Sequence, residues 1–196
     1  MSTQSDPKPQ PTELQSGLPP PKTLITGHNA EGKAIVQAER PATWTIFEGG
    51  IMGFNQIYTN QAPPDLNGDA DIRYHDDRLA SGKLGLAVKS GTVCRMVDFA
   101  PEYVCMMHRT QSLDFGIVVE GEVDMILDDG SSTPMRRGDV AVQRATMHAW
   151  RNSSTTSWAR MIFVLQDTKP LFVNGERYGE DYGRGTEGVL PSGNDD

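Results

Sequence analysis

Hydrophobic residues in this chain gather in short runs separated by turn-forming residues, a pattern that predicts β-strands rather than helices. The clearest runs follow residue 83, where no window of eleven residues has a convincing helical period. The strands predicted there are Thr92–Phe99, Phe115–Val119, Glu122–Leu127, Val140–Val142, His148–Arg151 and Arg160–Leu165. Regularly spaced short strands of this kind are typical of a β-sandwich or a β-barrel.

The chain before residue 84 adds weaker strand signals and one long polar stretch. The additional predicted strands are Thr23–Gly27, Ala34–Gln37, Trp44–Phe47 and Phe54–Thr59. Residues 60–77 are rich in Pro, Asp, Asn and Gly, which favours a loop that acts as a lid or an arm, or a disordered segment. We therefore expect residues 23–83 to supply strands and a loop that pack on a barrel formed by residues 84–170.

Both ends of the chain have the composition of segments that lack a core. Residues 1–22 are polar and rich in proline, and the C-terminal tail, residues 171–196, is rich in glycine and acidic residues from about residue 176. Such segments bury too little hydrophobic surface to offset the entropy lost on ordering. We expect both termini to be disordered, with the alternative that the C-terminal tail wraps along the barrel.

Length, charge and apolar content exclude several classes of protein. A chain of 196 residues with 37% hydrophobic residues suits one domain with appendages. The net charge of −8 and the absence of basic clusters argue against a nucleic-acid partner. No run of 18 apolar residues predicts a membrane span, and the N-terminus lacks the apolar core of a secretory signal. A cytoplasmic location follows by default, and Cys94 and Cys105 are expected to be reduced thiols.

Two polar constellations carry the chemical information. In the first, His108, Thr110 and Asp114 are followed after six residues by Gly121. In the second, Gly138 precedes a His-x-x-x-Asn sequence formed by residues 148–152. Their spacing resembles the two motifs of the cupin family, although residues 143 and 145 are Gln and Ala where the family has Pro and Gly. The resemblance covers about residues 88–167, and its flanks look like small cupins of microbial secondary-metabolism clusters.

The resemblance implies an all-β protein with a single jelly-roll type cupin barrel, extra N-terminal strands and disordered termini. It also implies a metal site, because His108 and His148 match family ligands and Asp114 stands at the glutamate position. Two imidazoles and one carboxylate are the ligands of non-haem Fe(II) sites, and Zn, Ni or Mn are alternatives. However, aspartate is shorter than glutamate, and Thr110, at the position of a further histidine, is a poor ligand. A metal-free polar pocket therefore stays open.

Strand alternation identifies candidate substrate-binding residues, because residues two apart share one face of a strand. If His108 and His148 point inward, Thr110, Trp150 and Asn152 do so too. Arg109 can bind a substrate carboxylate from beside the first motif, and Gln143 can reach the mouth of the cavity. Ordinary core packing is the alternative for the tryptophan, and a solvated surface position is the alternative for the arginine.

Three functions remain open at this point. The first is a metal-dependent enzyme with Fe-type dioxygenase chemistry on a small aromatic or polyketide-like substrate, with His108, Asp114 and His148 as catalytic and metal-binding residues. The second is a metal-free lyase or isomerase, a dehydratase or a decarboxylase, in which the two histidines act as acid and base. The third is a non-catalytic cupin that binds a small molecule. The resemblance further implies a homodimer that exchanges or packs the N-terminal strands.

Overall fold

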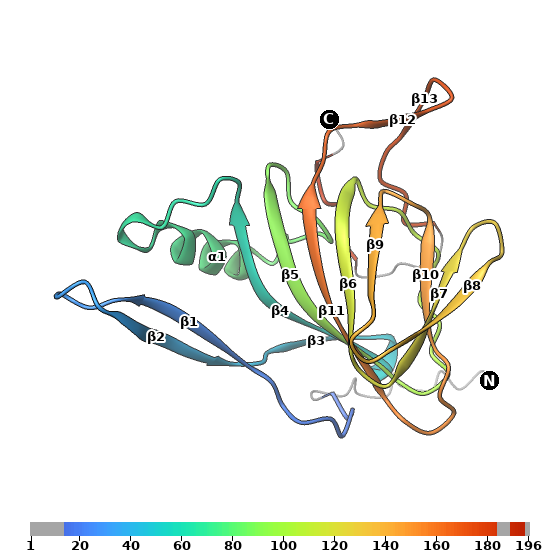
Figure 1. The fold of residues 1–196 in the computed structure, drawn as a ribbon, viewed down its shortest axis with the longest axis horizontal. Coiled ribbons are helices and arrows are strands. Elements are labelled where there is room, and N and C mark those ends of the chain that lie inside the picture. The colour runs from blue at the N-terminus through green and yellow to red at the C-terminus, as the bar shows by residue number, and fades with distance from the viewer. Residues whose placement is uncertain (1–13, 184–188, 195–196) are drawn as a thin grey trace, which may run out of the picture.

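The computed structural model describes residues 14–183 and 189–194, and two antiparallel sheets dominate it (Figure 1). In spatial order, the six-stranded sheet contains β3 (Trp44–Phe47), β4 (Met52–Gln61), β5 (Gly91–Phe99), β11 (Ala159–Asp167), β6 (Ser112–Glu120) and β9 (Val140–Arg144). The three-stranded sheet contains β10 (His148–Asn152), β7 (Glu122–Leu127) and β8 (Ser132–Arg136). The two sheets face each other across a shared core, which confirms the predicted all-β barrel.

The core forms because inward positions of the facing strands are apolar while their neighbours point outward. On β5, Val93, Val97 and Phe99 point inward and are almost fully buried. They belong to two clusters, and the larger one joins Val97 and Phe99 to Trp150 and Met161 on other strands. The core therefore lies between the two sheets. A polar residue at an inward position of these strands also points into this interior.

The barrel sheet begins earlier in the chain than the predicted boundary at residue 84. Strand β4 pairs with β5 along nearly its whole length, from Met52 opposite Phe99 to Gln61 opposite Gly91, and β3 pairs with β4. Both strands are thus part of the barrel and not a layer packed on it. The hairpin of β1 (Lys22–His28) and β2 (Ala34–Pro41), by contrast, projects away from the barrel as an arm (Figure 1).

The loop predicted for residues 60–77 is wrong in part, because η2 (Asn67–Asp69) and the helix α1 (Ala70–Ser81) lie there. The helix contacts β4 through a narrow side, and His75 is its only buried residue. One buried position leaves no hydrophobic repeat in the sequence, so the periodicity could not reveal the helix. His75 accepts a hydrogen bond from the backbone N–H of Thr59 (3.2 Å) and stacks on Tyr58. None of the described residues forms a helix long and apolar enough to cross a bilayer.

The C-terminal segment follows the barrel, the alternative that its sequence left open. A small hairpin of β12 (Leu171–Val173) and β13 (Glu176–Tyr178) leads into it. The Oγ of Ser192 accepts a hydrogen bond from the N–H of Ala87 (2.9 Å), and the side chain of Asn194 is buried against Gln111. Near the N-terminus, the carbonyl of Pro19 accepts a hydrogen bond from the side chain of Arg160 on β11. The expected disorder of residues 1–13, 184–188 and 195–196 lies outside the described residues.

A buried ion pair on β5 and β11 ties the sheet together. Arg160 donates from Nε and Nη2 to the two carboxylate oxygens of Asp98, at 2.6 and 2.7 Å, and both side chains are nearly inaccessible to solvent. We expect Asp98→Asn to lower the free energy of unfolding by about 3–5 kcal/mol, because the change leaves a buried guanidinium without its counterion. Denaturant unfolding measures this loss.

The exposed pair between Arg137 and Glu120 is the matched control. Glu120→Gln removes an ion pair of similar length (2.6 Å) at the surface, so the loss should stay below about 1 kcal/mol. Equal losses for the two variants would show that the burial of the pair on β5 and β11 contributes nothing.

Candidate active site

The barrel encloses a cavity whose walls are mainly aromatic and aliphatic side chains. The cavity volume is about 70 Å³, and the empty space reaches about 700 Å³ only when the solvent at its open mouth is counted. Polar groups are few and come from several elements of the fold. Those that line it are Glu48, Arg95, Tyr103, Cys105, His108, Asp114 and His148.

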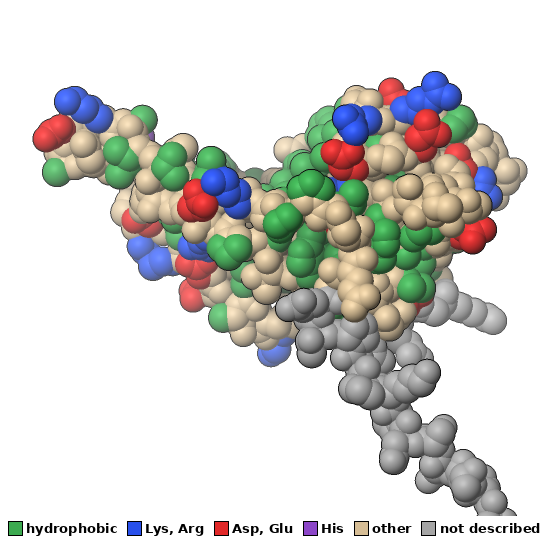
Figure 2. Space-filling model, turned by 90° about the horizontal axis from the view of Figure 1, so that it is seen from below, with side chains coloured by type: hydrophobic (Ala, Val, Ile, Leu, Met, Phe, Trp, Pro, Cys, Tyr) green, Lys and Arg blue, Asp and Glu red, His purple; other side chains and the backbone are tan. Residues whose placement is uncertain are grey.

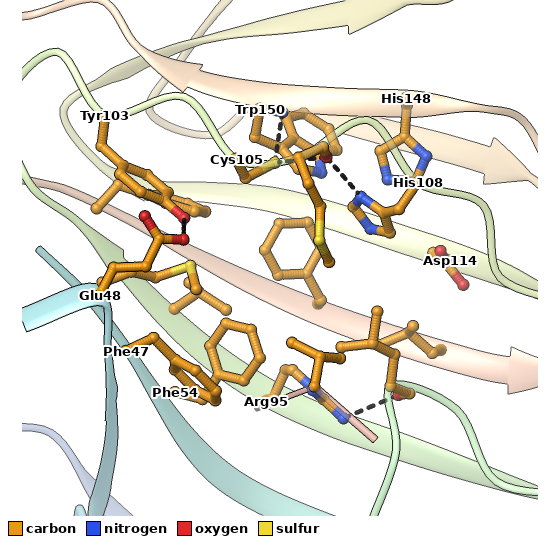
Figure 3. Close-up of a pocket in the computed structure, with 18 residues that line it drawn as sticks. Phe47, Glu48, Phe54, Arg95, Tyr103, Cys105, His108, Asp114, His148 and Trp150 are labelled. Carbon is orange, nitrogen blue, oxygen red and sulfur yellow. Dashed lines mark hydrogen bonds between the residues drawn. The ribbon is translucent and has the colours of Figure 1, made fainter. Parts of the chain in front are cut away.

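His108 and His148 lie side by side on one wall of this cavity (Figure 3). Their ring centroids are 4.5 Å apart, and the ring planes are tilted by 48°. The backbone fixes this pair, because the N–H of each residue donates to the carbonyl of the other at 2.9 Å. His148 begins β10, whereas His108 lies in the segment that leads to β6. The structure thus joins the two cupin-like motifs at the imidazoles.

The hydrogen bonds of the two rings determine which nitrogen carries the proton. Nδ1 of His108 lies 3.0 Å from the carbonyl of Met106, and Nδ1 of His148 lies 2.9 Å from the carbonyl of Thr146. A carbonyl only accepts, so each Nδ1 donates and each Nε2 keeps its lone pair. Two unprotonated Nε2 atoms are therefore available to accept a proton or to bind an electrophile.

Burial keeps both imidazoles neutral. Loss of hydration lowers the pKa of His108 and lowers the pKa of His148 to about 3, and the neighbouring ring lowers the latter further. Near pH 7 neither ring carries a charge. The pair therefore combines two basic nitrogens with no electrostatic repulsion between them.

Asp114 lies on the inner face of β6 and also lines the cavity. Its Oδ2 accepts a hydrogen bond from Thr110 Oγ1 (3.3 Å), whereas its buried Oδ1 has no partner among the described residues. Burial raises the pKa of this carboxyl to about 6, while hydrogen bonding with Ser112 and Thr110 and the charge of Arg95 oppose the shift. Near neutral pH this carboxyl can therefore hold or release a proton.

Metal binding by His108, Asp114 and His148 stays a prediction. In the described ranges, no group of three or more His, Cys, Asp or Glu side chains is arranged to hold a metal ion. Thr110 occupies the position of a further family histidine, and its hydroxyl holds the shorter carboxylate of Asp114. His108, Asp114 and His148 line one cavity, but the residues do not fit a metal held by all three.

Trp150 is the predicted substrate-binding residue that lines the cavity. Its indole meets His148 edge-on, with centroids 5.6 Å apart, and lies 5.5 Å from the ring of Phe163. It is also part of the barrel core, so cavity wall and core packing are the same role here. A flat hydrophobic surface beside the imidazoles favours binding of planar organic molecules.

Thr110 and Asn152 are not among the residues that line this cavity, and their role in substrate binding stays a prediction. Thr110 is buried behind Asp114 and accepts a bond from Ser112 Oγ (2.6 Å). The Asn152 amide donates to the backbone carbonyls of Phe99, Ala100 and Ser157. Both side chains use their polar atoms to hold the protein's own structure.

Arg109 and Gln143 are not among the lining residues either, and their predicted role is likewise untested. Arg109 Nε donates to the carbonyl of Gly179 (2.7 Å), and its guanidinium lies over the ring of Tyr178, so it anchors the C-terminal segment. The amide of Gln143 is buried and donates to the sulfur of Met125 (3.0 Å). Strand parity predicts the face on which a side chain lies, but it does not predict which neighbour takes its hydrogen bonds.

Sequence reasoning missed four polar residues of the cavity. Arg95 lies on β5 between inward-facing valines, and a lone charge in such a strand is a signal that could have revealed it. The hydroxyl of Tyr103 donates to Glu48 (2.8 Å), a contact between segments far apart in the chain. Burial raises the pKa of Cys105 to about 12, so its thiol stays protonated and unreactive.

Comparison of the sequence with known proteins shows the family to which this chain belongs. No protein-family model matches the chain. It is 40% identical to the phomopsin biosynthesis cluster protein C' of Diaporthe leptostromiformis over 176 residues, which cover 89% of this chain and 93% of that protein. It is 45% identical to the cupin-domain-containing oxidoreductase virC of Hypocrea virens over 154 residues, 76% of this chain and 77% of virC. The chain therefore belongs to the cupin superfamily, in one family with these relatives from secondary-metabolism clusters.

Solved structures with a similar fold are more distant. The polyketide cyclase RemF from Streptomyces resistomycificus is 14% identical with a TM-score of 0.45, and the match covers 74% of this chain and 82% of RemF. KdgF from Halomonas sp. is 16% identical with a TM-score of 0.43, and the match covers 65% of this chain and 89% of KdgF. The assignment to the family rests on the more similar sequences described above.

The lowered pKa of His148 makes the stability depend on pH in a defined direction. Below its ordinary pKa of 6.5 the unfolded chain takes up a proton that the folded protein excludes, so folding stability falls as the pH falls. Between pH 7.5 and pH 5 the free energy of unfolding should fall by about 2 kcal/mol less for His148→Gln than for the wild type. Denaturant unfolding at the two pH values measures this difference.

The control is His28→Gln, which changes an exposed imidazole on β1. This variant should keep the pH dependence of the wild type. The raised pKa of Asp114 acts in the opposite direction, since stability then falls as the pH rises from 3.8 towards 6, but it is common to all three proteins. Parallel pH curves for His148→Gln and the wild type would contradict the burial of a neutral imidazole.

Proposed function

We propose that this protein is a small-molecule enzyme of secondary metabolism that transfers protons to and from an organic substrate in the barrel cavity. The observation that carries this proposal is the pair of neutral imidazoles with both Nε2 atoms unprotonated in a largely hydrophobic cavity. Both imidazoles are unprotonated near pH 7 and can accept a proton from a substrate, although the lowered pKa values make them weaker bases than an exposed histidine. Dehydration and tautomerisation of a polyketide-like molecule are the reactions that need only such groups.

A dehydration can be assigned to the residues present. Nε2 of one imidazole removes the proton from a carbon beside a carbonyl group, and the electron pair of that bond expels the hydroxyl from the next carbon. The carboxyl of Asp114 protonates the departing hydroxyl, which leaves as water. Its pKa of about 6 maintains a protonated fraction near neutral pH, and the proton taken by the imidazole restores it through solvent.

The second candidate is the oxidation that the relatives' names suggest. The relatives virC of Hypocrea virens and fogC of Aspergillus ruber are named cupin-domain-containing oxidoreductases, and this chain is 45% and 42% identical to them. A metal-dependent dioxygenase with Fe, or with Zn, Ni or Mn, is the form of this candidate predicted from the sequence. The incomplete ligand set favours proton transfer over it.

Isotope incorporation distinguishes the two candidates. Extracts of the source organism with the gene deleted supply the accumulated substrate, and purified protein is added in D2O. We expect the product to form without O2, and either to be lighter than the substrate by one water, for dehydration, or to carry deuterium at a carbon position, for tautomerisation. His148→Gln should slow product formation by about 100–1,000-fold, because a general base contributes about that much, and mass spectrometry measures both effects.

His28→Gln again provides the matched control and should retain the wild-type rate. Elemental analysis of untagged protein belongs to the same experiment, and we expect no stoichiometric metal. A metal bound one to one and lost on His148→Ala, together with 18O from O2 in the product, would establish the oxidation instead.

We also propose that the protein is a homodimer joined through its N-terminal arm. The hairpin β1–β2 projects from the barrel, and hydrophobic side chains lie on it among charged ones (Figure 2). Leu24 and Val36 are more than half exposed, and Val36 lies opposite Thr26, which shares a face with Leu24. An isolated two-stranded hairpin is marginally stable in water, which favours a partner surface. A cytoplasmic location stays a prediction.

Light scattering coupled to size exclusion tests the dimer. We expect the wild type to have the mass of two chains and the double change Leu24→Glu with Val36→Glu to give a monomer, because two carboxylates on that face oppose its burial. Val142→Glu on the exposed face of β9 is the control and should leave the mass unchanged. A monomeric wild type would exclude the proposed arrangement.

A further inference from the structure

Arg95 is a buried cation in the wall of the cavity. It lies on the inner face of β5, is 5% exposed and lines the cavity together with His108 and His148. Figure 3 shows it across the cavity from the two imidazoles, near Phe54, whose ring centroid lies 5.2 Å from the guanidinium carbon. Any molecule that contacts the imidazoles therefore lies close to this positive charge.

No ion pair of Arg95 is found in the part of the chain that the structure describes, although Asp114 in the same cavity interacts with its charge at longer range. Its Nη2 donates to the backbone carbonyls of Gly85 (2.6 Å) and Leu86 (2.8 Å), which orient the guanidinium but carry no charge. Its Nε is buried and has no hydrogen-bond partner. Burial lowers the pKa of Arg95 to about 10, so it stays protonated at neutral pH.

Arg160, in the same sheet, is a buried arginine with a structural role, and it has a counterion. Arg160 is paired with both oxygens of Asp98, three residues beyond Arg95 on β5. Leaving a buried charge unpaired is strongly unfavourable, and proteins normally supply a counterion. The absence of a close counterion to Arg95 among the described residues leaves a place there for the anionic group of a ligand.

The two carboxylates of the cavity do not fill this role. Glu48 accepts a hydrogen bond from the hydroxyl of Tyr103, and Asp114 accepts a hydrogen bond from the hydroxyl of Thr110. Neither forms an ion pair with Arg95 among the described residues. The cavity therefore presents one unsatisfied cation on one side and two neutral bases on the other.

We propose that Arg95 binds the carboxylate of a small organic acid, and that the substrate of this enzyme belongs to that class. The carboxylate lies at the guanidinium, and the rest of the molecule extends along the hydrophobic walls towards the imidazoles. Because Gly85 and Leu86 take the hydrogens of Nη2, the Nε–H, which has no partner among the described residues, is the donor available to a carboxylate, and a buried position strengthens such a bond. This inference names the substrate class of the proposed function, but the binding itself requires no turnover.

Matched pairs of acids and amides test the proposal without knowledge of the substrate. Benzoate and benzamide, and cyclohexanecarboxylate and its amide, have the same shape and differ in charge. Isothermal titration calorimetry should show that the wild type binds at least one acid about tenfold or more tightly than its amide. Arg95→Gln should lose this preference while amide binding stays unchanged.

Arg144→Gln is the control, because it removes an exposed arginine of β9 and lowers the net charge equally. It should keep the preference of the wild type. If Arg95→Gln does not fold, Arg95→Lys retains the charge without the planar guanidinium and should weaken acid binding by a smaller factor. No preference in the wild type, or a full preference in folded Arg95→Gln, would overturn the proposal.

The outcome is independent of the isotope experiment. Acid selectivity without a dehydrated or deuterated product would retain Arg95 as the anion site and remove the proton-transfer reaction. A dehydrated or deuterated product without acid selectivity would retain the proton-transfer reaction and remove Arg95 as the anion site.

Discussion

Two reciprocal backbone hydrogen bonds between His108 and His148 hold the imidazole pair on which the chemistry of this protein depends. They connect the segment before β6 to the start of β10, so the two rings meet inside the barrel although forty residues separate them in the sequence. Because the neighbouring carbonyls occupy both Nδ1 atoms, the basic Nε2 atoms are fixed without any contribution from a ligand. The barrel thus orients the bases before a substrate enters.

Burial in the barrel then gives each ionisable group of the cavity a different state. The same loss of hydration lowers the pKa of the histidines, raises the pKa of Asp114 to about 6 and leaves Arg95 protonated because its ordinary pKa is far higher. Neutral bases, a carboxyl that can hold a proton and a permanent cation therefore coexist within one small space. This combination suits an acidic substrate that exchanges protons.

Segments outside the barrel strands also shape the site. Val189 of the C-terminal segment lines the cavity, and Ser192 holds that segment to Ala87 beside it. Arg109 ties the same part of the chain to the first cupin-like motif through Gly179 and through paired backbone bonds with Asp181. The match to the phomopsin cluster protein covers 89% of this chain, so the relationship extends beyond the barrel strands.

The sequence by itself determined the barrel, most of its strands and the pairing of His108 with His148. Alternation of polar and apolar residues and the spacing of motifs are local properties, and they survive in a linear reading. Only the tertiary structure decided that helix α1 exists, that Asn152 and Gln143 serve the protein's own structure, and that Arg95 faces the imidazoles. Those outcomes depend on whether a residue distant in the sequence provides a hydrogen-bond partner for each polar group. The partners come together only when the sheets pack around a common interior.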